Sequence, residues 1–508
     1  MTAVAAKNLA RLNEQAFERR GDYPSLFFEG RWHRSAQLLD RSRRLGGGLI
    51  ELGIEPGERV VVCMANCPEV TVSYQALWRA GAVVTPAMFL LSTEDLRHLI
   101  AHSEASAVIT TPEFANKVRD AVAPLEHVRH LIVAGAGEGD ADGVVALAAL
   151  EASDPAPIVP RADDDLAVLL YTGGTTGRAK GVMISHAGLH FTGHAVQQAA
   201  HVGGVTRALT ALPLAHAYGI LITISGLHAP ERPVTVLLRW FDPGAFLAMV
   251  QEHRVQTAPL VPAMIQLLLA QPLEEYDLSS LRYLGSGAAP LAPELVDALR
   301  RRAPWISIRQ GYGLSETAAL VSTNPAGAEK PGSVGLPIPG AEVRILDEFD
   351  NELARGEPGE VCVRSPAVMQ GYWRAPETTA DTIRDGWLHT GDIGYLDDEG
   401  YLFIVDRKKD VIIRGGFNVY PRDVEDALLE HPAVAGAGVV GRPDERRGEE
   451  VVAFVALTAP RAISAEALIE WARRRIGGYK YPREVHIIDA MPLTAVGKLD
   501  RKALRRLL

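Results

Sequence analysis

The sequence predicts an α/β protein that ends in a smaller α+β unit. Short β-branched runs alternate with stretches of helical period through much of the chain, which is typical of parallel strands joined by crossover helices. From about residue 331 the pattern changes to short alternating strands, separated by turns rich in Pro, Gly and acidic residues. A charged run at residues 406–410 precedes a last unit of mixed helices and strands. These observations predict the fold class.

The middle of the chain shows the α/β alternation best. An earlier α/β region covers residues 1 to about 160 and ends in loop-like stretches rich in Gly, Asp, Ala and Pro. After it, strands and helices are expected in turn, and the helix at 262–269 has proline in its first turn. The expected elements, starting with a strand and alternating, are residues 234–238, 244–253, 257–261, 262–269, 281–284, 293–302 and 306–309.

The last third of the chain predicts two different units. Alternating strands at residues 341–346, 360–364 and 401–405 indicate a small antiparallel β subdomain. After the charged run, two helices and three strands indicate a compact α+β unit, and Ser464 is a suitable N-cap for its second helix. The helices are expected at residues 421–430 and 465–476, and the strands at 434–440, 451–457 and 484–488.

Composition excludes several classes of protein. The chain has 508 residues with 52 Lys+Arg and 62 Asp+Glu, a net charge of −10, so nucleic acid or an anionic membrane surface is not the expected main partner. Its three cysteines, Cys63, Cys67 and Cys362, predict neither a disulfide framework nor a zinc site. The first ten residues lack the apolar segment of a signal peptide, and no apolar run is long enough to span a membrane. We therefore expect a cytoplasmic protein.

The most informative segment runs from Asp165 to Gly181. It is an apolar strand that opens into a loop with four glycines, three threonines, Arg178 and Lys180. Glycines let backbone N–H groups turn inward, hydroxyls donate hydrogen bonds, and the two cations stabilise polyphosphate charge. It is not a Walker A loop, because Lys180 is followed by glycine rather than Ser or Thr. The alternative is a flexible connection without a ligand.

This loop resembles the phosphate-binding signature of adenylate-forming enzymes, the superfamily of acyl-CoA synthetases, firefly-type luciferases and peptide-synthetase adenylation domains. The family usually has serine at the position of Gly174 and proline at that of Ala179. The resemblance implies that Lys180 is catalytic and that the loop binds ATP through Thr172, Gly173, Gly174, Thr175, Thr176, Gly177 and Lys180.

Residues 310–317 resemble the family segment that binds adenine and metal. The resemblance implies that Tyr312 stacks on the purine, between Gly311 and Gly313. Glu316 would hold Mg²⁺ on ATP, since a hard cation prefers carboxylate oxygen. Ser315, where relatives usually carry threonine, would donate to the α-phosphate.

Two further motifs resemble the ribose site and the hinge of the family. His389-Thr-Gly-Asp392 implies that the Asp392 carboxylate accepts from the ribose hydroxyls. The run at residues 406–410 implies that Arg407 also reaches the ribose and that Lys409 is the hinge. Lys408 is expected to be a solvated charge.

The C-terminal unit carries two more family motifs. Residues 492–501 resemble the last motif, whose lysine reaches the active site during adenylation, so Lys498 is the first candidate for catalysis. Residues 414–421 resemble the loop that replaces this lysine after the small domain rotates. Gly415 and Gly416 would then line the tunnel for the pantetheine arm of coenzyme A. Lys180, the Mg²⁺ held by Glu316, and Lys498 would stabilise the charge that develops as pyrophosphate leaves.

The acyl group is expected to be apolar. Residues 213–219 resemble the mouth of the family's acyl pocket, with His216 beside the substrate carboxylate, although His216 could instead be a packed core histidine. Relatives that activate amino acids carry an aspartate near this point, where this chain has Ala217 and Tyr218, which argues against an amino acid. A fatty, aryl or bulky ring acid is expected. The implied pocket residues are His216, Tyr218, Gly219, Gly285, Gly287 and Ala288.

The resemblance covers nearly the whole chain and implies a specific domain organisation. A large N-terminal domain at residues 1–406 would contain two α/β subdomains and a small β-barrel-like subdomain, followed by a hinge and a small mobile α+β domain. The expected limits are 1–165 and 166–330 for the α/β subdomains, 331–406 for the β subdomain, 407–410 for the hinge and 411–508 for the C-terminal domain.

The implied activity is that of an ATP-dependent acid–thiol ligase, a monomer or homodimer that uses ATP, Mg²⁺ and coenzyme A. The alternatives are transfer of the acyl group to a carrier protein's phosphopantetheine, a luciferase-like oxygenase, and a non-catalytic nucleotide-binding protein. Intact Lys180, Glu316, Asp392, Arg407 and Lys498 argue against the last of these.

Overall fold

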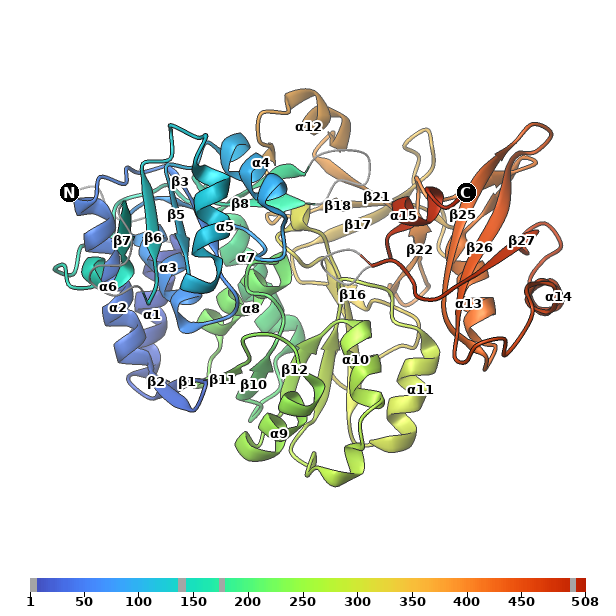
Figure 1. Ribbon diagram of the computed structural model, residues 1–508, viewed down its shortest axis with the longest axis horizontal. Helices are drawn as coiled ribbons and strands as arrows, with labels where there is room; N and C mark the ends of the chain where they lie inside the picture. Colours follow the sequence, from blue (N-terminus) through green and yellow to red (C-terminus); the bar gives the residue numbers. More distant parts are fainter. Residues whose placement is uncertain (1–6, 136–142, 173–178, 494–498) are drawn as a thin grey trace.

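The computed structural model describes residues 7–135, 143–172, 179–493 and 499–508. In these ranges the strands form four sheets. Three of them make up the larger part of the molecule, and the fourth lies at one end of it (Figure 1). In the described ranges, no helix is long and apolar enough to cross a membrane.

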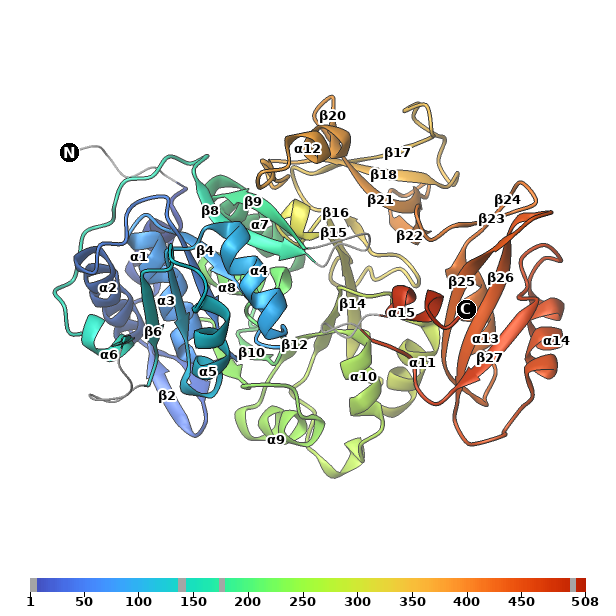
Figure 2. The same ribbon diagram turned by 45° about the horizontal axis from the view of Figure 1, so that its top comes forward.

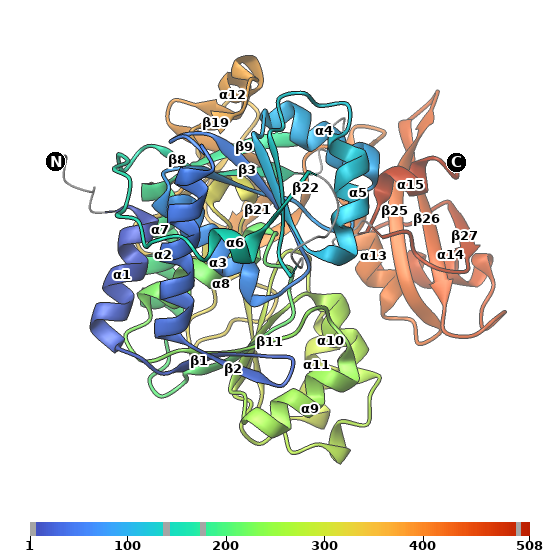
Figure 3. The ribbon, with the colours of Figure 1, turned by 60° about the vertical axis from the view of Figure 1, so that its left-hand side comes forward.

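The first sheet has eight strands and is covered by helices on both faces. Along β3 the side chains alternate: Val60 and Val62 join the core beneath α2 and α3, whereas Val61 and Cys63 join the core beneath α4 and α5. Figure 3 shows α4 and α5 on one side and α1 and α2 on the other. In sheet order the strands are β19 (Gly371–Tyr372), β9 (Lys180–Ser185), β8 (Leu166–Thr172), β4 (Val83–Pro86), β3 (Arg59–Cys63), β5 (Ala107–Thr110), β6 (His130–Val133) and β7 (Val144–Ala146). The helices are α1 (Leu9–Arg20), α2 (Ser35–Glu51), α3 (Pro68–Arg79), α4 (Thr93–Ser103), α5 (Pro112–Val122), α6 (Leu147–Leu150) and α7 (His186–Ala200).

The second sheet has nine strands and is parallel at its centre. Helices α9, α10 and α11 bury their apolar sides against one face of it. In sheet order the strands are β16 (Leu336–Pro337), β15 (Ser322–Thr323), β14 (Ser307–Tyr312), β13 (Tyr283–Ser286), β12 (Thr257–Leu260), β10 (Arg207–Thr210), β11 (Val234–Leu237), β1 (Pro24–Phe28) and β2 (Arg31–Arg34). The helices are α8 (Ala217–His228), α9 (Pro243–His253), α10 (Pro262–Leu269) and α11 (Pro293–Arg302), with the 3₁₀ turns η1 (Leu273–Glu275) and η2 (Ser315–Thr317).

The two large sheets exchange segments across residue 165. Strands β1 and β2 come from the N-terminal end of the chain but pair with β11 in the second sheet. Strands β8 and β9 follow residue 165 but belong to the first sheet, where β8 lies parallel to β4. The sheets are therefore interleaved in sequence, because strand pairing depends on contacts between distant segments.

The third sheet is antiparallel and leads to the C-terminal unit. Figure 2 shows its strand β22 beside the fourth sheet. Its strands are β17 (Glu342–Leu346), β18 (Gly359–Arg364), β21 (Trp387–Leu396), β20 (Ile383–Arg384) and β22 (Leu402–Arg407), and its helix is α12 (Pro376–Thr382).

The fourth sheet has a hydrophobic core of its own. Side chains of α13 and α14 pack on one face, and Leu504 of α15 packs on the other. The strands are β24 (Phe417–Val419), β23 (Ile412–Arg414), β26 (Gly448–Leu457), β25 (Val434–Asp444) and β27 (Glu484–Ile488), and the helices are α13 (Pro421–Leu429), α14 (Ala465–Arg475) and α15 (Arg501–Arg505).

The predicted fold class is confirmed, since α/β sheets are followed by a β sheet and a smaller α+β unit. The helix expected at residues 262–269 has those limits in α10, and the strand expected at 484–488 has those limits in β27. Strand β26 begins three residues earlier than the expected 451, at Gly448, because it continues into a long hairpin with β25. Ser464 caps α14 as expected, accepting a hydrogen bond from the N–H of Ala467.

Candidate active site

A bulge in β21 presents the predicted ribose ligand. In the pairing of β18 with β21, Glu360 lies opposite Ile393 and Cys362 lies opposite His389. An advance of two residues on β18 therefore corresponds to four residues on β21, so β21 carries the extra residues. The extra residues include Gly391, whose φ of 71° favours glycine. Such a bulge redirects a side chain out of the regular alternation of the strand. Here it presents the carboxylate of Asp392.

Asp392 meets groups from two other strands. The hydroxyl of Tyr312, at the end of β14, donates to Asp392 Oδ2 over 2.7 Å. Arg407 lies opposite Asp392 in the register of β22 with β21, and its Nε is 3.3 Å from Oδ1. Burial, together with the Asp392 carboxylate, raises the pKa of Tyr312, so the phenol keeps the proton that it donates. The structure thus brings together the three residues expected at the nucleoside.

A second cluster gathers Lys180 and Glu316 around Tyr372. Lys180 opens β9 opposite Thr172, and its Nζ lies 4.9 Å from the centre of the Tyr372 ring. The Tyr372 hydroxyl donates to Glu316 Oε1 over 2.8 Å. Burial and the neighbouring carboxylate raise the pKa of Tyr372. The phenol therefore aligns a carboxylate from the turn η2 with a cation from β9.

Tyr372 was missed in the motifs above. It lies on β19, a two-residue strand that pairs with β9, far in sequence from both Lys180 and Glu316. The only local signal is an aromatic pair, Tyr372-Trp373, after Gly371. Neighbouring aromatic residues are more often part of a hydrophobic core than of a functional site. Only the pairing of β19 with β9 therefore identifies Tyr372 as a neighbour of Lys180.

The turn that carries Glu316 has a strained backbone. Ser315 opens the 3₁₀ turn η2, and Ala318 and Ala319 follow it with φ values of 48° and 83°. A Cβ at Gly313 would lie 2.2 Å from the Ala319 carbonyl oxygen, so the chain can close here only with glycine. Left-handed alanines persist where surrounding contacts determine the conformation. The contacts here place Tyr312 and Glu316 on two sides of one turn, with Gly311 in β14 before it.

The expected acyl-pocket residues come from two elements that meet. His216 is the N-cap of α8, and its Nδ1 accepts from the Tyr218 N–H over 3.2 Å. The ring of Tyr218 lies over the end of β13: a Cβ at Gly285 would be 3.1 Å from its hydroxyl, and one at Gly287 would be 3.5 Å from its Cε1. Burial raises the pKa of Tyr218. Glycines at 285 and 287 therefore leave room for an aromatic side chain.

For Gly219 and Ala288, two of the expected acyl-pocket residues, the local backbone geometry has a distinct feature. A Cβ at Gly219 would lie 2.3 Å from the Pro213 carbonyl oxygen, so glycine is required there by packing within the segment. Ala288 has a φ of 66°, which marks the chain reversal after β13. Neither observation assigns them to a ligand.

Several predicted residues lie outside the described part of the chain. These are Gly173, Gly174, Thr175, Thr176 and Gly177 of the phosphate loop, and Lys498 of the last motif. For the loop, the structure describes the flanking residues Thr172 and Lys180, which face each other across β8 and β9.

The hinge residues have partners on both sides. Lys408 is half-exposed, but its ammonium pairs with Glu360 over 2.9 Å, so the expectation of a merely solvated charge is wrong. The carboxylate of Asp410, one residue beyond Lys409, pairs with Arg505 over 2.8 Å.

Gly415 and Gly416 form the two-residue turn between β23 and β24. Their φ values of 60° and 81° are those of a type I′ hairpin, which explains two glycines without a ligand. Among the described residues, no atom lies within 4 Å of a Cβ built at either glycine. Their place in a pantetheine tunnel stays a prediction.

Most cations on the surface of the C-terminal unit are already paired. Arg473 and Arg474 form ion pairs with Glu470, Arg475 forms one with Glu430, and Lys480 forms one with Asp423. Arg446 is exposed and has no ion pair among the described residues.

Comparisons with known proteins identify the family of the chain. Residues 12–373 match the family described as AMP-binding enzyme, and residues 423–498 match the AMP-binding enzyme C-terminal domain. The chain is 39% identical to a feruloyl-CoA synthase of Amycolatopsis sp over 475 residues, which covers 93% of each chain. It is 33% identical to a long-chain-fatty-acid–CoA ligase of Escherichia coli O157:H7, covering 98% of this chain and 94% of the relative.

A solved structure shows the same fold over the whole chain. ATP-bound MatB from Rhodopseudomonas palustris has a TM-score of 0.90 and 29% identity, with 98% of each chain covered. The resemblance inferred from the motifs is confirmed: the chain belongs to the AMP-binding enzyme family of adenylate-forming enzymes.

Proposed function

We propose that the protein is an AMP-forming acid–thiol ligase, which activates a hydrophobic carboxylic acid with ATP and transfers the acyl group to coenzyme A. One observation carries the proposal: the segment from Tyr312 to Glu316 joins the Asp392 and Arg407 cluster to the Lys180 and Tyr372 cluster. A nucleoside on the first cluster would direct its phosphates toward the second.

In the first half-reaction, a carboxylate oxygen of the acid attacks the α-phosphorus of ATP. The new O–P bond forms as the bond to the β-phosphate bridging oxygen breaks, and pyrophosphate leaves with its electron pair. Two anions approach each other in this step, so positive groups must lie where charge develops. We propose that Lys180, which lies beside Tyr372, supplies one of these groups and that Lys498 supplies the second.

Glu316 fits a role in binding Mg²⁺. One of its oxygens accepts from Tyr372, and among the described residues no cation pairs with it. Mg²⁺ in phosphate-transfer sites is usually held by one or two carboxylates and by substrate phosphates, which matches a single glutamate. When bound, the ion would neutralise phosphate charge.

In the second half-reaction, the thiol of coenzyme A attacks the acyl carbon of the acyl-AMP. The C–S bond forms, the C–O bond to the phosphate breaks, AMP leaves with the electron pair of that bond, and the thiol proton passes to solvent. We propose that the C-terminal domain turns about Lys409, withdraws Lys498 and brings Gly415 and Gly416 to the site. The two paired residues flanking Lys409 support a pivot at this position.

The proposed substrate class is an aryl or fatty acid. The ring of Tyr218 lies against Gly285 and Gly287, so an aromatic group faces two positions that carry no side chain. A pocket of this kind favours apolar groups, because a buried polar group without a partner is costly. The relatives named for feruloyl-CoA and for long-chain fatty acids support both subclasses.

ATP–pyrophosphate exchange across a panel of acids tests the first half-reaction. The panel contains hydroxycinnamic acids, benzoic acids, fatty acids of several lengths, amino acids and a dicarboxylic acid. Exchange with aryl or fatty acids is expected, and exchange only with amino acids or a dicarboxylic acid would contradict the proposed class. Glu316→Gln should lose exchange activity. The control is Glu357→Gln, which should retain exchange, because Glu357 is an exposed carboxylate between β17 and β18 of the third sheet.

The acceptor requires a second assay with the acid found in the first. Thioester formation is followed with coenzyme A and with a holo carrier protein, each at a series of concentrations. Acylation of the carrier protein alone would overturn the choice of coenzyme A, and light emission with a luciferin adenylate would indicate an oxygenase. Failure of exchange with every acid, despite nucleotide binding, would favour a non-catalytic nucleotide-binding protein.

A further inference from the structure

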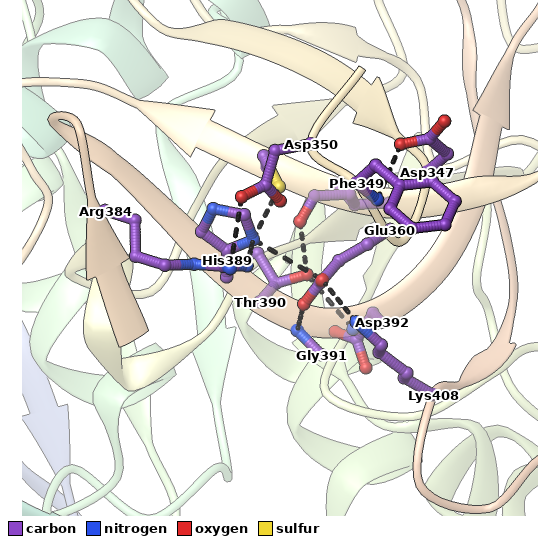
Figure 4. Close-up of polar contacts among 12 residues, drawn as sticks. Asp347, Phe349, Asp350, Glu360, Arg384, His389, Thr390, Gly391, Asp392 and Lys408 are labelled. Atoms are coloured by element: carbon purple, nitrogen blue, oxygen red, sulfur yellow. Dashed lines mark hydrogen bonds and ion pairs between the residues drawn. The ribbon is translucent and has the colours of Figure 1, made fainter. Parts of the chain in front are cut away.

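A buried glutamate on β18 lies behind the ribose turn. The side chain of Glu360 is only 7% exposed, and its two oxygens are used separately. Oε1 accepts from the Gly391 N–H over 3.1 Å, and Oε2 accepts from the Lys408 ammonium over 2.9 Å. Figure 4 shows Glu360 between His389 and Lys408 and close to Gly391.

This cluster is a hydrogen-bond network rather than a metal site. Ligand atoms of Glu360, Cys362 and His389 lie within 4.8 Å of one another, as metal ligands would. However, Arg384 lies 2.6 Å from His389 Nδ1, and an arginine can only donate, so this nitrogen already accepts. Lys408 neutralises Glu360 on the other side. Burial also raises the pKa of Cys362 to about 12, so its thiol keeps its proton.

The network fixes the backbone of the ribose turn from several sides. The Thr390 hydroxyl donates to the Val361 carbonyl over 2.7 Å and accepts from the Asp392 N–H over 3.1 Å. The Lys408 N–H donates to the Gly391 carbonyl over 2.8 Å. Gly391 has no side chain and a left-handed φ, so its orientation depends on these partners. Glu360 holds its N–H, and Lys408 holds its C=O.

Glu360 and Lys408 also anchor the N-terminal side of the hinge. Lys408 is bound to Glu360 through its ammonium and to Gly391 through its N–H, both in the N-terminal body. Asp410 is bound to Arg505 and lies 3.9 Å from Arg501, both in the C-terminal unit. Lys409 therefore lies between a residue attached to one part and a residue attached to the other.

We propose that Glu360 is a positioning residue, which orients Asp392 toward the nucleotide through Gly391 and fixes the N-terminal side of the hinge through Lys408. The inference rests on the proposed nucleotide site and deepens it. Glu360 does not touch the reacting atoms. It acts by holding the turn whose next residue binds the ribose.

Binding of AMP by the full chain tests this, because it needs neither the acid nor turnover. The dissociation constant is measured by isothermal titration calorimetry for wild type, Glu360→Ala, Glu360→Gln, Lys408→Met and the double variant Glu360→Gln/Lys408→Met. Loss of a hydrogen bond to a charged group corresponds to about tenfold in affinity, and that is the rise in dissociation constant expected for Glu360→Ala. Glu342→Gln, which disrupts an exposed pair with Arg364 on the same sheet, is the control and should bind AMP as wild type does.

The double variant separates positioning from simple destabilisation. Lys408→Met leaves a buried carboxylate without its cation, so it should weaken AMP binding more than Glu360→Gln does. Removing the charge as well, in Glu360→Gln/Lys408→Met, should restore much of the affinity. In exchange assays the KM for ATP should follow the same order, while kcat and the KM for the acid change by no more than about twofold.

Two results would overturn the inference. One is an unchanged AMP affinity in Glu360→Ala. The other is a double variant that binds AMP as weakly as Lys408→Met, which would indicate a general structural defect. If Glu360→Ala does not fold, the two variants of matched volume, Glu360→Gln and the double variant, still decide the question. If wild type binds AMP but no acid supports exchange, the ligase proposal fails and the affinities still test Glu360.

Discussion

The N-terminal body and the C-terminal unit prepare their functional residues in different ways. In the body, Asp392 has Tyr312 and Arg407 as partners, and Glu316 has Tyr372. Each of these contacts joins elements that are far apart in the chain, so the geometry is maintained by the fold itself. In the C-terminal unit, the Gly415–Gly416 turn projects without a described atom near its Cβ positions, and most surface cations are neutralised within the unit.

The difference indicates that the two parts of the molecule would contribute to the proposed reaction in different ways. Under the proposed function, the body would bind the nucleotide with groups that are already oriented, which avoids reorganising polar groups as charge develops. The C-terminal unit has its own core on both faces of its sheet, so it can move as one piece. Its residues would act by being placed at the site rather than by being held there permanently.

Lys498→Ala should have the largest effect. Removing one group that stabilises developing charge typically lowers kcat by about 10²–10³. We expect a loss of this size in pyrophosphate exchange, and little change in thioester formation from supplied acyl-AMP. Rapid quench of each half-reaction measures both. An equal loss in the two half-reactions would mean that the unit does not contribute separately to each.

Tyr312→Phe should raise the KM for ATP by about tenfold, because it removes a hydrogen bond to the buried Asp392 carboxylate and keeps the ring. The matched control is Tyr401→Phe, which loses the hydroxyl contact to the Ala328 carbonyl away from the ribose turn. Steady-state kinetics with varied ATP compare the two. Equal KM values for both variants would show that the Tyr312 hydroxyl does not hold Asp392 for the nucleotide.

Gly416→Ala should slow thioester formation by up to about tenfold, because a Cβ at a φ of 81° strains the turn by roughly 1–2 kcal/mol. Adenylation should be unaffected, since the turn lies outside the clusters of the body. Gly478→Ala is the control within the same unit, because its Cβ would meet no atom within 4 Å and its φ is ordinary. A defect in adenylation instead would place the turn at the nucleotide in both steps.

Acid should reduce the stability that Glu360 contributes. Burial, the largest single influence, would raise its pKa, but Lys408 and then His389 together more than offset this and leave the pKa below the ordinary glutamate value. The contribution is therefore complete above the unfolded pKa of about 4.3 and is lost as the pH falls through the folded pKa. We expect the Tm difference between wild type and Glu360→Gln to stay constant from pH 7 to about pH 5 and to shrink as the pH falls below about 4. A difference that grows in acid would contradict the ion pair.

Arg473→Ala should have the smallest effect. The side chain already pairs with Glu470 at the surface, and such pairs contribute only about 0–1 kcal/mol. The KM for coenzyme A should change by less than about twofold. Arg446→Ala should raise it more, because Arg446 is exposed, has no ion pair among the described residues, and is the cation we propose for the phosphates of coenzyme A. A larger effect of Arg473→Ala would mean that its ion pair opens when coenzyme A binds.

Many elements could be predicted because their signals are local. Helix α10 follows a proline, α14 follows the cap Ser464, and β27 is a short apolar run, so each depends on neighbours in sequence. Tyr372 could not be predicted as part of the site, because only the pairing of β19 with β9 brings it to Lys180. The role of Glu360 could not be predicted either, because the sequence shows it only as an acidic residue in an expected strand.

By itself, the sequence determined the fold class, the family and the residue types needed to bind a nucleotide. The glycine and threonine loop, Glu316, Asp392 and Lys498 carry chemistry that can be recognised from type and order. Tertiary structure alone decided which groups align them: the interleaving of the two large sheets, the bulge that presents Asp392, and the partners Tyr372 and Glu360. The physical reason is that hydrogen bonds and ion pairs form between neighbours in space, and strand pairing makes neighbours of residues that are far apart in the chain.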